Sequence, residues 1–146
     1  RNVIPNFIYW SMKKKQLPIT GEGTETRDFT YVLDLVQGLV KSAYYENAVG
    51  KEFNLASSKE TKIISLATKI NKMTNNPNDI KFLKKRKWDT KTRLVASIEL
   101  ARKIIDYKPI VRLDEGLNTN LQWFRYNFEE IDRFADFKPG ISSALK

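Results

Sequence analysis

The sequence contains neither cysteine nor histidine. Without cysteine the chain forms no disulfide, has no thiol nucleophile and offers no thiolate to a metal. Without histidine it lacks the most common general base and the usual nitrogen ligand of zinc. Histidine-dependent catalytic triads are therefore excluded and no bound metal is expected. A cytoplasmic location is predicted, because the chain carries no disulfide framework.

Long apolar runs are also missing from the sequence. No stretch approaches the roughly 18 apolar residues of a membrane-spanning helix, so no membrane partner is expected. With 146 residues, 41% of them hydrophobic, the chain can form one globular domain with a modest core. It begins with Arg1 rather than methionine and runs directly into an apolar segment, which predicts a fragment of a longer protein.

The net charge of +9 is concentrated in two places. Residues 81–93 hold seven lysines and arginines against one aspartate, an excess of six, and residues 13–15 are three lysines. Such clusters favour an anionic ligand, whether nucleic acid, an anionic membrane or a phosphorylated small molecule. A lysine-rich surface that is merely hydrated is the alternative for most of the individual lysines.

Apolar spacing and turn residues predict an α+β fold, mainly helices around short strands. The expected helices cover residues 3–14, 32–45, 62–74, 98–105 and 115–131. The expected strands cover residues 17–20, 27–31, 52–56 and 80–83. Ser97 and Asp114 are candidate N-caps of the last two helices. Residues 138–146 lack periodicity and are predicted to form a flexible tail.

One segment, Gly-Glu-Gly-Thr-Glu-Thr-Arg-Asp-Phe-Thr-Tyr-Val at residues 21–32, combines a glycine turn with an Arg–Asp pair and a β-rich run. A guanidinium on a strand edge is a rigid fork for phosphate or carboxylate. Arg27 is therefore a candidate anion ligand, and a structural pair with Asp28 or another carboxylate is the alternative. In an extended segment Asp28 faces the opposite way, so we interpret it as structural.

This segment resembles the "GxGxQxRDFxYVxD" stretch of the extended short-chain dehydrogenase/reductase superfamily, the NAD-dependent nucleotide-sugar epimerases and dehydratases. Other anchors that resemble this family follow in its order, so that the resemblance covers nearly all of residues 2–126. They are residues 2–8, 17–21, 53–57, 85–89, 108–117 and 123–124. Together these anchors identify the chain with the C-terminal half of such an enzyme.

The resemblance implies an α/β enzyme of which residues 1–137 are the α+β C-terminal substrate-binding lobe, without the Rossmann domain. The full-length enzyme would act in the manner of a UDP-glucose 4-epimerase, through transient oxidation at the sugar C4. Epimerase, dehydratase and decarboxylase outcomes all stay open. The implied partner is a nucleotide-diphosphate sugar, and the implied cofactor is NAD, bound by the missing N-terminal domain. A homodimer is expected for the full-length enzyme.

The family motifs imply six substrate-binding residues: Asn2, Pro18, Thr20, Arg27, Arg86 and Asp89. The two arginines would hold the diphosphate, and Asp89 would accept hydrogen bonds from the ribose hydroxyls, a division that suits a guanidinium and a carboxylate. Pro18 and Thr20 would line the base, although the family usually has an aromatic residue in place of Thr20. Asn2 would contact the diphosphate or the sugar, and it can also cap the first helix.

Lys87 and Trp88 stand where the family pattern has Pro-Gly. Trp88 is interpreted either as a cover for the nucleotide or as a loop aromatic that packs on the domain surface. Asn54 is equally compatible with a satisfied amide inside a strand and with a ligand.

No catalytic residue is assigned within the chain. A Gly-x-Gly-x-x-Gly loop for NAD pyrophosphate does not occur in the sequence. Tyr9 and Lys13 have the Tyr-x-x-x-Lys spacing of the family's catalytic pair, but they lie on the helix that in the family stands outside the active site.

The alternative function is a small basic nucleic-acid-binding module that uses residues 81–93, with Trp88 as a stacking platform. Charge placement separates the two hypotheses. A nucleic-acid surface needs basic side chains along one continuous groove, whereas a nucleotide-sugar site needs two arginines that converge on one diphosphate. We therefore expect a nucleotide sugar rather than nucleic acid as the partner.

Overall fold

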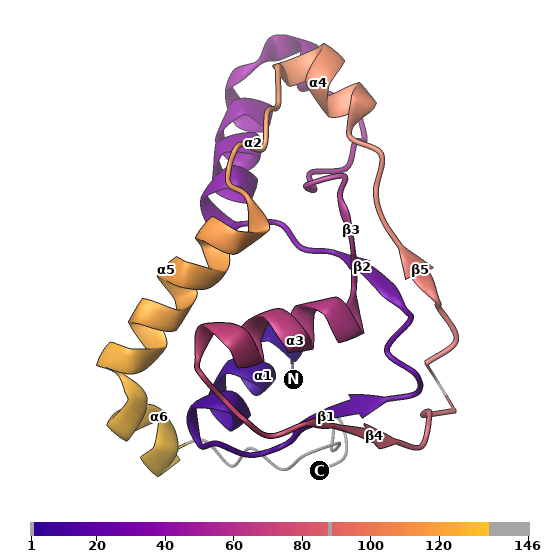
Figure 1. Ribbon diagram of the computed structural model, residues 1–146. Coiled ribbons are helices and arrows are strands. Elements are labelled where there is room, and N and C mark those ends of the chain that lie inside the picture. The colour runs from indigo at the N-terminus through magenta and orange to yellow at the C-terminus, as the bar shows by residue number, and fades with distance from the viewer. Residues whose placement is uncertain (1, 88, 135–146) are drawn as a thin grey trace. The chain divides into compact units, whose positions relative to one another are not determined.

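The computed structural model describes residues 2–87 and 89–134, which form a small mixed α/β fold (Figure 1). Helices make up about half of this part of the chain, and its strands are short. The chain divides into two compact units. Unit 1 comprises Arg1–Glu25, Lys62–Thr92 and Leu117–Lys146, and unit 2 comprises Thr26–Thr61 and Arg93–Gly116.

Unit 1 is built from helices around one pair of parallel strands. Its elements are α1 (Val3–Met12), β1 (Leu17–Thr20), α3 (Ile63–Met73), β4 (Ile80–Leu83), the part of α5 (Leu113–Tyr126) from Leu117 onward, and α6 (Phe128–Phe134). β1 and β4 pair in register from Leu17↔Ile80 to Thr20↔Leu83. The core of the unit comes from α1, β1, α3 and α5, and its most buried apolar residues are Phe7, Ile8, Leu17, Ile19, Leu66, Ala67, Ile70 and Leu117.

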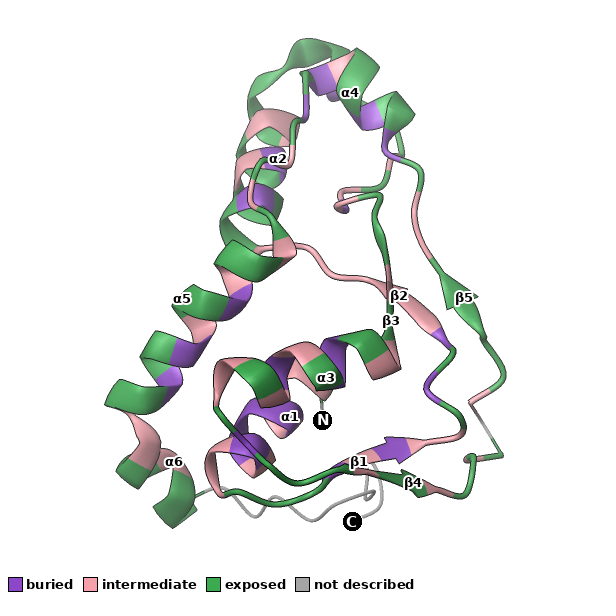
Figure 2. Ribbon diagram, viewed as in Figure 1, coloured by how far each residue is buried: buried purple, intermediate pink, exposed green. Residues whose placement is uncertain are grey.

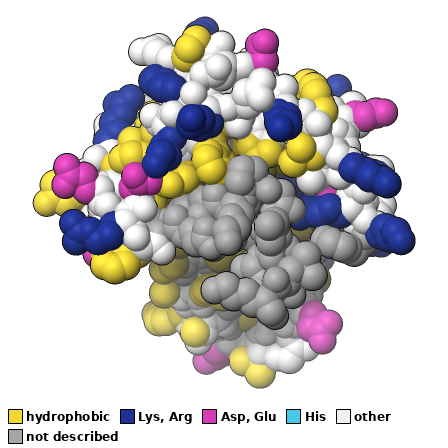
Figure 3. Space-filling view, turned by 90° about the horizontal axis from the view of Figure 1, so that it is seen from below, with side chains coloured by type: hydrophobic (Ala, Val, Ile, Leu, Met, Phe, Trp, Pro, Cys, Tyr) yellow, Lys and Arg dark blue, Asp and Glu magenta, His cyan; other side chains and the backbone are white. Residues whose placement is uncertain are grey.

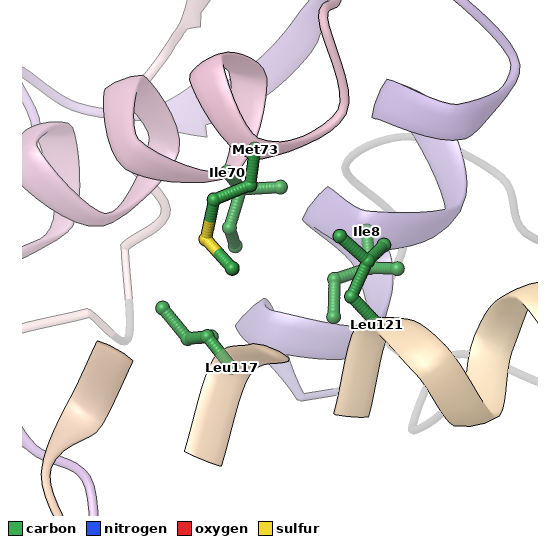
Figure 4. Close-up of a pocket in the computed structure, with 5 residues that line it drawn as sticks. All are labelled: Ile8, Ile70, Met73, Leu117 and Leu121. Atoms are coloured by element: carbon green, nitrogen blue, oxygen red, sulfur yellow. The ribbon is translucent and has the colours of Figure 1, made fainter. Parts of the chain in front are cut away.

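A small pocket in unit 1 belongs to this core. It is lined by Ile8 of α1, Ile70 and Met73 of α3, and Leu117 and Leu121 of α5 (Figure 4). All five lining side chains are apolar, so the pocket offers no hydrogen bond or charge to a nucleotide. We interpret it as a gap in helix packing rather than as a binding site.

Unit 2 contains a three-stranded sheet and two helices. β2 (Thr26–Asp28) is the central strand between β3 (Glu60–Lys62) and β5 (Arg93–Leu94), and β2 runs parallel to β5. α2 (Val32–Tyr44), a 3-10 turn at Glu46–Ala48 and α4 (Glu99–Ile105) complete the unit. Its buried core cluster is Ala48, Ala56, Ile98, Ala101, Ile105 and Tyr107.

α2 faces this core with its small and polar residues. The buried Asp34 carboxylate accepts hydrogen bonds from the backbone N–H groups of Ile110 (3.1 Å) and Val111 (3.0 Å). A Cβ at Gly38 would lie 2.7 Å from Leu55 and 2.9 Å from Tyr107, so only glycine fits there. The apolar stripe of α2 points to water instead, as Figure 2 shows by the exposed and intermediate residues along most of the helix.

Most of the predicted helices are confirmed. Those over residues 3–14, 32–45 and 62–74 agree with α1, α2 and α3 to within a few residues. The expected helix 98–105 is α4, which begins at Glu99. The prediction that Ser97 caps it is wrong, because the N-cap residue is Ile98; the N–H of Glu99 lies 3.5 Å from the Ser97 hydroxyl.

The expected helix over 115–131 is wrong in its bounds. α5 begins at Leu113, so Asp114 lies inside the helix rather than capping it. Asn127 separates α5 from α6. Its backbone N–H closes the last turn of α5 by donating to the Trp123 carbonyl at 3.1 Å, and its side-chain amide donates to the same carbonyl at 2.8 Å.

Two of the four predicted strands, 17–20 and 80–83, are confirmed as β1 and β4, and the other two are not. Residues 52–56 do not form a strand: Phe53 and Leu55 alternate because both pack against the unit 2 core, and Asn54 donates to the Ser97 carbonyl at 3.3 Å. The expected strand 27–31 is shorter, because Tyr31 is already the N-cap of α2. β3 and β5 were not expected, since strands of two or three residues carry no readable alternation. The predicted tail, residues 138–146, lies outside the described residues.

Candidate functional site

The parallel pairing of β1 and β4 brings two loops to one strand edge in unit 1. Both strands end at this edge, at Thr20 and Leu83, and the N–H of Gly21 donates to the Leu83 carbonyl at 2.9 Å. The basic loop, residues 84–92 between β4 and β5, begins directly after Leu83. The carboxyl ends of parallel strands are where α/β folds commonly bind ligands, so this edge is the candidate site.

Pro18 and Thr20 lie on one face of β1. They alternate with Leu17 and Ile19, which are 0% and 2% exposed, and are themselves half-buried. The face therefore presents a proline ring and a hydroxyl at a fixed position. Such a surface can support a flat ring by contact, but it has no aromatic side chain for stacking.

Arg86 and Asp89 lie close together in the loop after β4. Arg86 Nη2 donates to Asp89 Oδ2 at 3.0 Å, and the N–H of Asp89 donates to the Arg86 carbonyl at 3.1 Å. Their side chains are 34% and 21% exposed, so both groups are accessible yet held in one turn. A guanidinium suits phosphate oxygens, and an ionised carboxylate accepts from hydroxyls. Trp88 lies between them in the sequence and outside the described residues.

Arg27 belongs to unit 2, at the centre of β2. Its Nη1 donates to the Thr26 carbonyl at 2.8 Å, and the residue is half-buried. β2 has a neighbouring strand on each side, so its backbone is fixed. The strand thus presents a guanidinium from a rigid support.

The next residue, Asp28, anchors β2, which confirms its interpretation as structural. Its carboxylate accepts from the N–H and hydroxyl of Ser57 (3.0 Å to the nitrogen), from the N–H of Ser58 (2.9 Å) and from that of Ala96 (3.5 Å). These bonds tie β2 to two segments that are distant in sequence.

Asn2 lies on a different element from the strand edge. It occupies the N-cap position of α1, as expected, but its exposed side chain makes no capping hydrogen bond. Of the six predicted site residues, unit 1 contains five, and four of these lie on β1 or in the loop after β4.

Tyr9 and Lys13, which have the Tyr-x-x-x-Lys spacing, join α1 to α6. The Tyr9 hydroxyl donates a hydrogen bond to Asp132 Oδ1 at 2.6 Å, and Lys13 Nζ donates to the same oxygen at 2.7 Å. The hydrogen bonds from Lys13 and Tyr9 hold the pKa of Asp132 below its ordinary value. Burial and the neighbouring Asp132 raise the pKa of Tyr9. These two hydrogen bonds therefore hold the C-terminal part of α1 against α6.

Several lysines and arginines in residues 81–93 form ion pairs with carboxylates. Lys85 lies 3.7 Å from Glu25, Arg86 pairs with Asp89, and Arg93 donates two hydrogen bonds to Glu60. The contact with Arg93 lowers the pKa of Glu60. On the described part of the face shown in Figure 3, Lys and Arg side chains stand among hydrophobic and acidic ones.

The Glu25–Lys85 contact was missed by the sequence analysis. Glu25 is 8% exposed, which is rare for a carboxylate. The available signal was its position, since it stands where the resembled motif has glutamine.

A metal-binding cluster and a membrane-spanning helix are both absent from the described residues. Across residues 2–87 and 89–134, no three His, Cys, Asp or Glu side chains are grouped so as to hold a metal ion. None of the helices in the same part of the chain has both the length and the apolar character that crossing a bilayer requires.

The fold and the basic turn define a mixed α/β protein whose candidate site suits an anionic ligand. Residues 1–56 match the model of the NAD dependent epimerase/dehydratase family. The chain belongs to this family, as its relatives also indicate. NAD is the cofactor from which the family takes its name.

Three similar proteins illustrate the relationship. UDP-glucuronic acid decarboxylase 1 of Xenopus tropicalis is 35% identical over 127 residues, which are 87% of this chain and 30% of that protein. The structure of Epimerase Mth375 from Methanothermobacter thermautotrophicus is 47% identical with a TM-score of 0.90, over 92% of this chain and 40% of that one. The Bordetella bronchiseptica enzyme WbmF, solved with NAD+ and UDP, is 38% identical with a TM-score of 0.77, over 91% and 39%.

These alignments are partial on the side of the relatives. The chain spans about a third of the length of the first curated relatives and 40% of the Mth375 structure.

Proposed function

We propose that this chain is the C-terminal, nucleotide-sugar-binding part of an NAD-dependent epimerase, dehydratase or decarboxylase. The observation that carries the proposal is the Arg86–Asp89 pair, held accessible in the loop that follows β4, whose last residue Leu83 pairs with Thr20 of β1. The names of its relatives support the ligand class, since one acts on UDP-glucuronic acid and another was solved with UDP.

In this proposal each site residue has a separate role. Arg27 and Arg86 bind the diphosphate, and Asp89 accepts hydrogen bonds from the ribose hydroxyls. Pro18 and Thr20 support the base through the half-buried face of β1. Asn2 contacts the diphosphate or the sugar from the start of α1.

The glycine turn at residues 21–25 does not have the form of a loop that binds the pyrophosphate of NAD. The two glycines of the 21–25 turn have φ values of +82° and +73°, but the chain continues from them into β2 rather than into a helix. A Cβ at Gly23 would lie 3.1 Å from Ile64, so this glycine serves close packing. We therefore assign NAD, and the oxidation at the sugar C4 that it supports, to a further part of the protein and derive no catalytic step from this chain.

The exposed face of α2 supports the existence of such a further part. Val32, Leu33, Val36, Leu39 and Val40 are between 44% and 63% exposed on one helix of unit 2. Monomeric proteins rarely leave a contiguous apolar surface of this kind in water. We propose that the remaining part of the enzyme covers it.

Leu39→Ser tests this cover. In the full-length enzyme we expect a loss of about 1–3 kcal/mol in the free energy of unfolding, because a buried leucine is removed. In residues 1–146 alone the change should stay within about 0.5 kcal/mol, since Leu39 is 56% exposed. Urea denaturation of both lengths gives the comparison, with Leu100→Ser on α4 as the matched control. An equal effect of Leu39→Ser in both lengths would contradict the cover.

Arg86→Ala tests the proposed ligand. Calorimetric titration of the full-length enzyme with UDP should show an affinity about 10- to 150-fold lower, the equivalent of losing a charge-assisted contact of roughly 1.5–3 kcal/mol. Lys84→Ala is the matched control, because Lys84 is an exposed cation of the same loop. It should change the affinity only slightly and in a salt-dependent way. Equal losses in the two variants would indicate diffuse attraction and overturn the specific role of Arg86.

A further inference from the structure

Two loops leave the carboxyl edge of β1 and β4, and an ion pair joins them. The turn at residues 21–25 follows β1, and the basic loop follows β4. Glu25 Oε1 lies 3.7 Å from Lys85 Nζ, with side chains 10% and 47% exposed. A nearly buried carboxylate from one loop therefore attracts an accessible ammonium from the other.

The turn that carries Glu25 is fixed by its backbone. The Glu25 carbonyl accepts from the N–H of Ile63 at 3.0 Å, and the Gly23 carbonyl accepts from that of Ile64 at 2.9 Å. Both donors belong to the first turn of α3. At the other end, the N–H of Gly21 donates to the Leu83 carbonyl at 2.9 Å. The carboxylate of Glu25 thus projects from a rigid support.

Gly21 makes room for this carboxylate. An ideal Cβ at Gly21 would stand 2.9 Å from Glu25 Oε1 and 3.8 Å from Lys85 Cγ. The φ of +82° at Gly21 also suits glycine. Glycine, carboxylate and lysine stem are therefore packed together at the base of the basic loop.

We propose that Glu25 is a positioning residue for the nucleotide site, an inference that rests on the proposed function. Its carboxylate holds Lys85, the neighbour of Arg86, so that the guanidinium of Arg86 is positioned before the ligand arrives. A loop that is already ordered loses less conformational entropy on binding. Glu25 itself touches no ligand. Its effect depends on charge, because glutamine keeps the shape of the side chain and loses the attraction to Lys85.

The test is a double-mutant cycle of Glu25→Gln and Lys85→Met in the full-length enzyme, read by calorimetric titration with UDP. Each single variant should weaken UDP binding about 3- to 10-fold. The double variant should lose no more affinity than the single variant with the larger loss, because both substitutions remove the same contact. Lys84→Met, which removes an exposed neighbouring cation, should bind within about 2-fold of wild type at 0.15 M salt. Melting temperatures of the variants show whether the fold is intact.

The possible results are separable. Absence of UDP binding by the wild-type enzyme overturns the proposed function. Wild-type binding together with unchanged affinity in both single variants, or with losses that simply add in the double variant, overturns only the role of Glu25. If Glu25→Gln lowers the melting temperature, the comparison of Lys85→Met with Lys84→Met decides, because both side chains are exposed. Equal affinities in these two variants then count against the proposal.

Discussion

Replacing Asp28 by alanine is expected to lower the free energy of unfolding by about 2–4 kcal/mol. The carboxylate accepts from the N–H and hydroxyl of Ser57 and from the N–H groups of Ser58 and Ala96. Alanine leaves these donors without their acceptor, and the half-buried ones cannot recover their bonds fully from water. The loss should appear as a lower urea midpoint with an unchanged dependence on urea.

Asp106→Asn is the matched control for Asp28. Asp106 belongs to the same unit, and its partners are Lys108 at 2.7 Å and Lys41 at 3.9 Å. These cations lower the pKa of the Asp106 carboxyl, but surface ion pairs of this kind contribute little to stability. Asparagine also tolerates the φ of +49° at this position. A loss as large in Asp106→Asn as in Asp28→Ala would show that the network around Asp28 is not special.

The contrast between Asp28 and Arg27 shows how far the sequence leads. Strand alternation is a local property, so it predicts that two neighbouring side chains diverge. The partners of Asp28 lie 29 to 68 residues away, and no local pattern names them. Its structural role could be predicted, but the identity of the donors that it binds and its importance for unit 2 could not.

The same limit applies to the elements. α2 is predicted correctly because its apolar residues recur at helical spacing, yet spacing cannot say what covers them. The core-facing residues of α2 are Asp34 and Gly38. Asp34 is needed there because it accepts from the N–H of Ile110, and Gly38 because Tyr107 packs against it. β3 and β5 exist only because β2 lies between them, so tertiary pairing rather than propensity defines them.

The candidate site divides in a similar way. Arg86 and Asp89 stand three residues apart, a spacing at which two side chains in a turn can meet, and they form an ion pair. Glu25 and Lys85 follow different strands at the same carboxyl edge of unit 1's strand pair, and the parallel register of β1 and β4 brings them together. A contact between residues three apart is within reach of local sequence reasoning, whereas the contact between two loops required the fold.

Arg27→Ala should weaken binding of a UDP-sugar by the full-length enzyme about 10- to 150-fold and leave the fold nearly intact. A charge-assisted bidentate contact with the diphosphate is worth roughly 1.5–3 kcal/mol, which sets the expected loss of affinity. Stability should change little, because the bonds that anchor β2 to the rest of unit 2 come from Asp28. Titration with UDP-glucuronic acid and with UDP, together with melting temperatures, measures both effects.

Two variants sharpen this last experiment. Arg27→Lys keeps the positive charge but loses the planar fork, so its affinity should fall well below wild type if the contact is bidentate. Arg112→Ala removes an exposed arginine from the same unit and should leave the affinity nearly unchanged. UDP should follow the same order as the UDP-sugar, since both carry the diphosphate. Three results would each contradict a direct role for Arg27 in binding: an unchanged affinity in Arg27→Ala, unfolding of that variant, or an equal loss of affinity in Arg112→Ala. The comparison with Arg112 is informative because binding of a diphosphate depends on the position of the guanidinium and not on net charge alone.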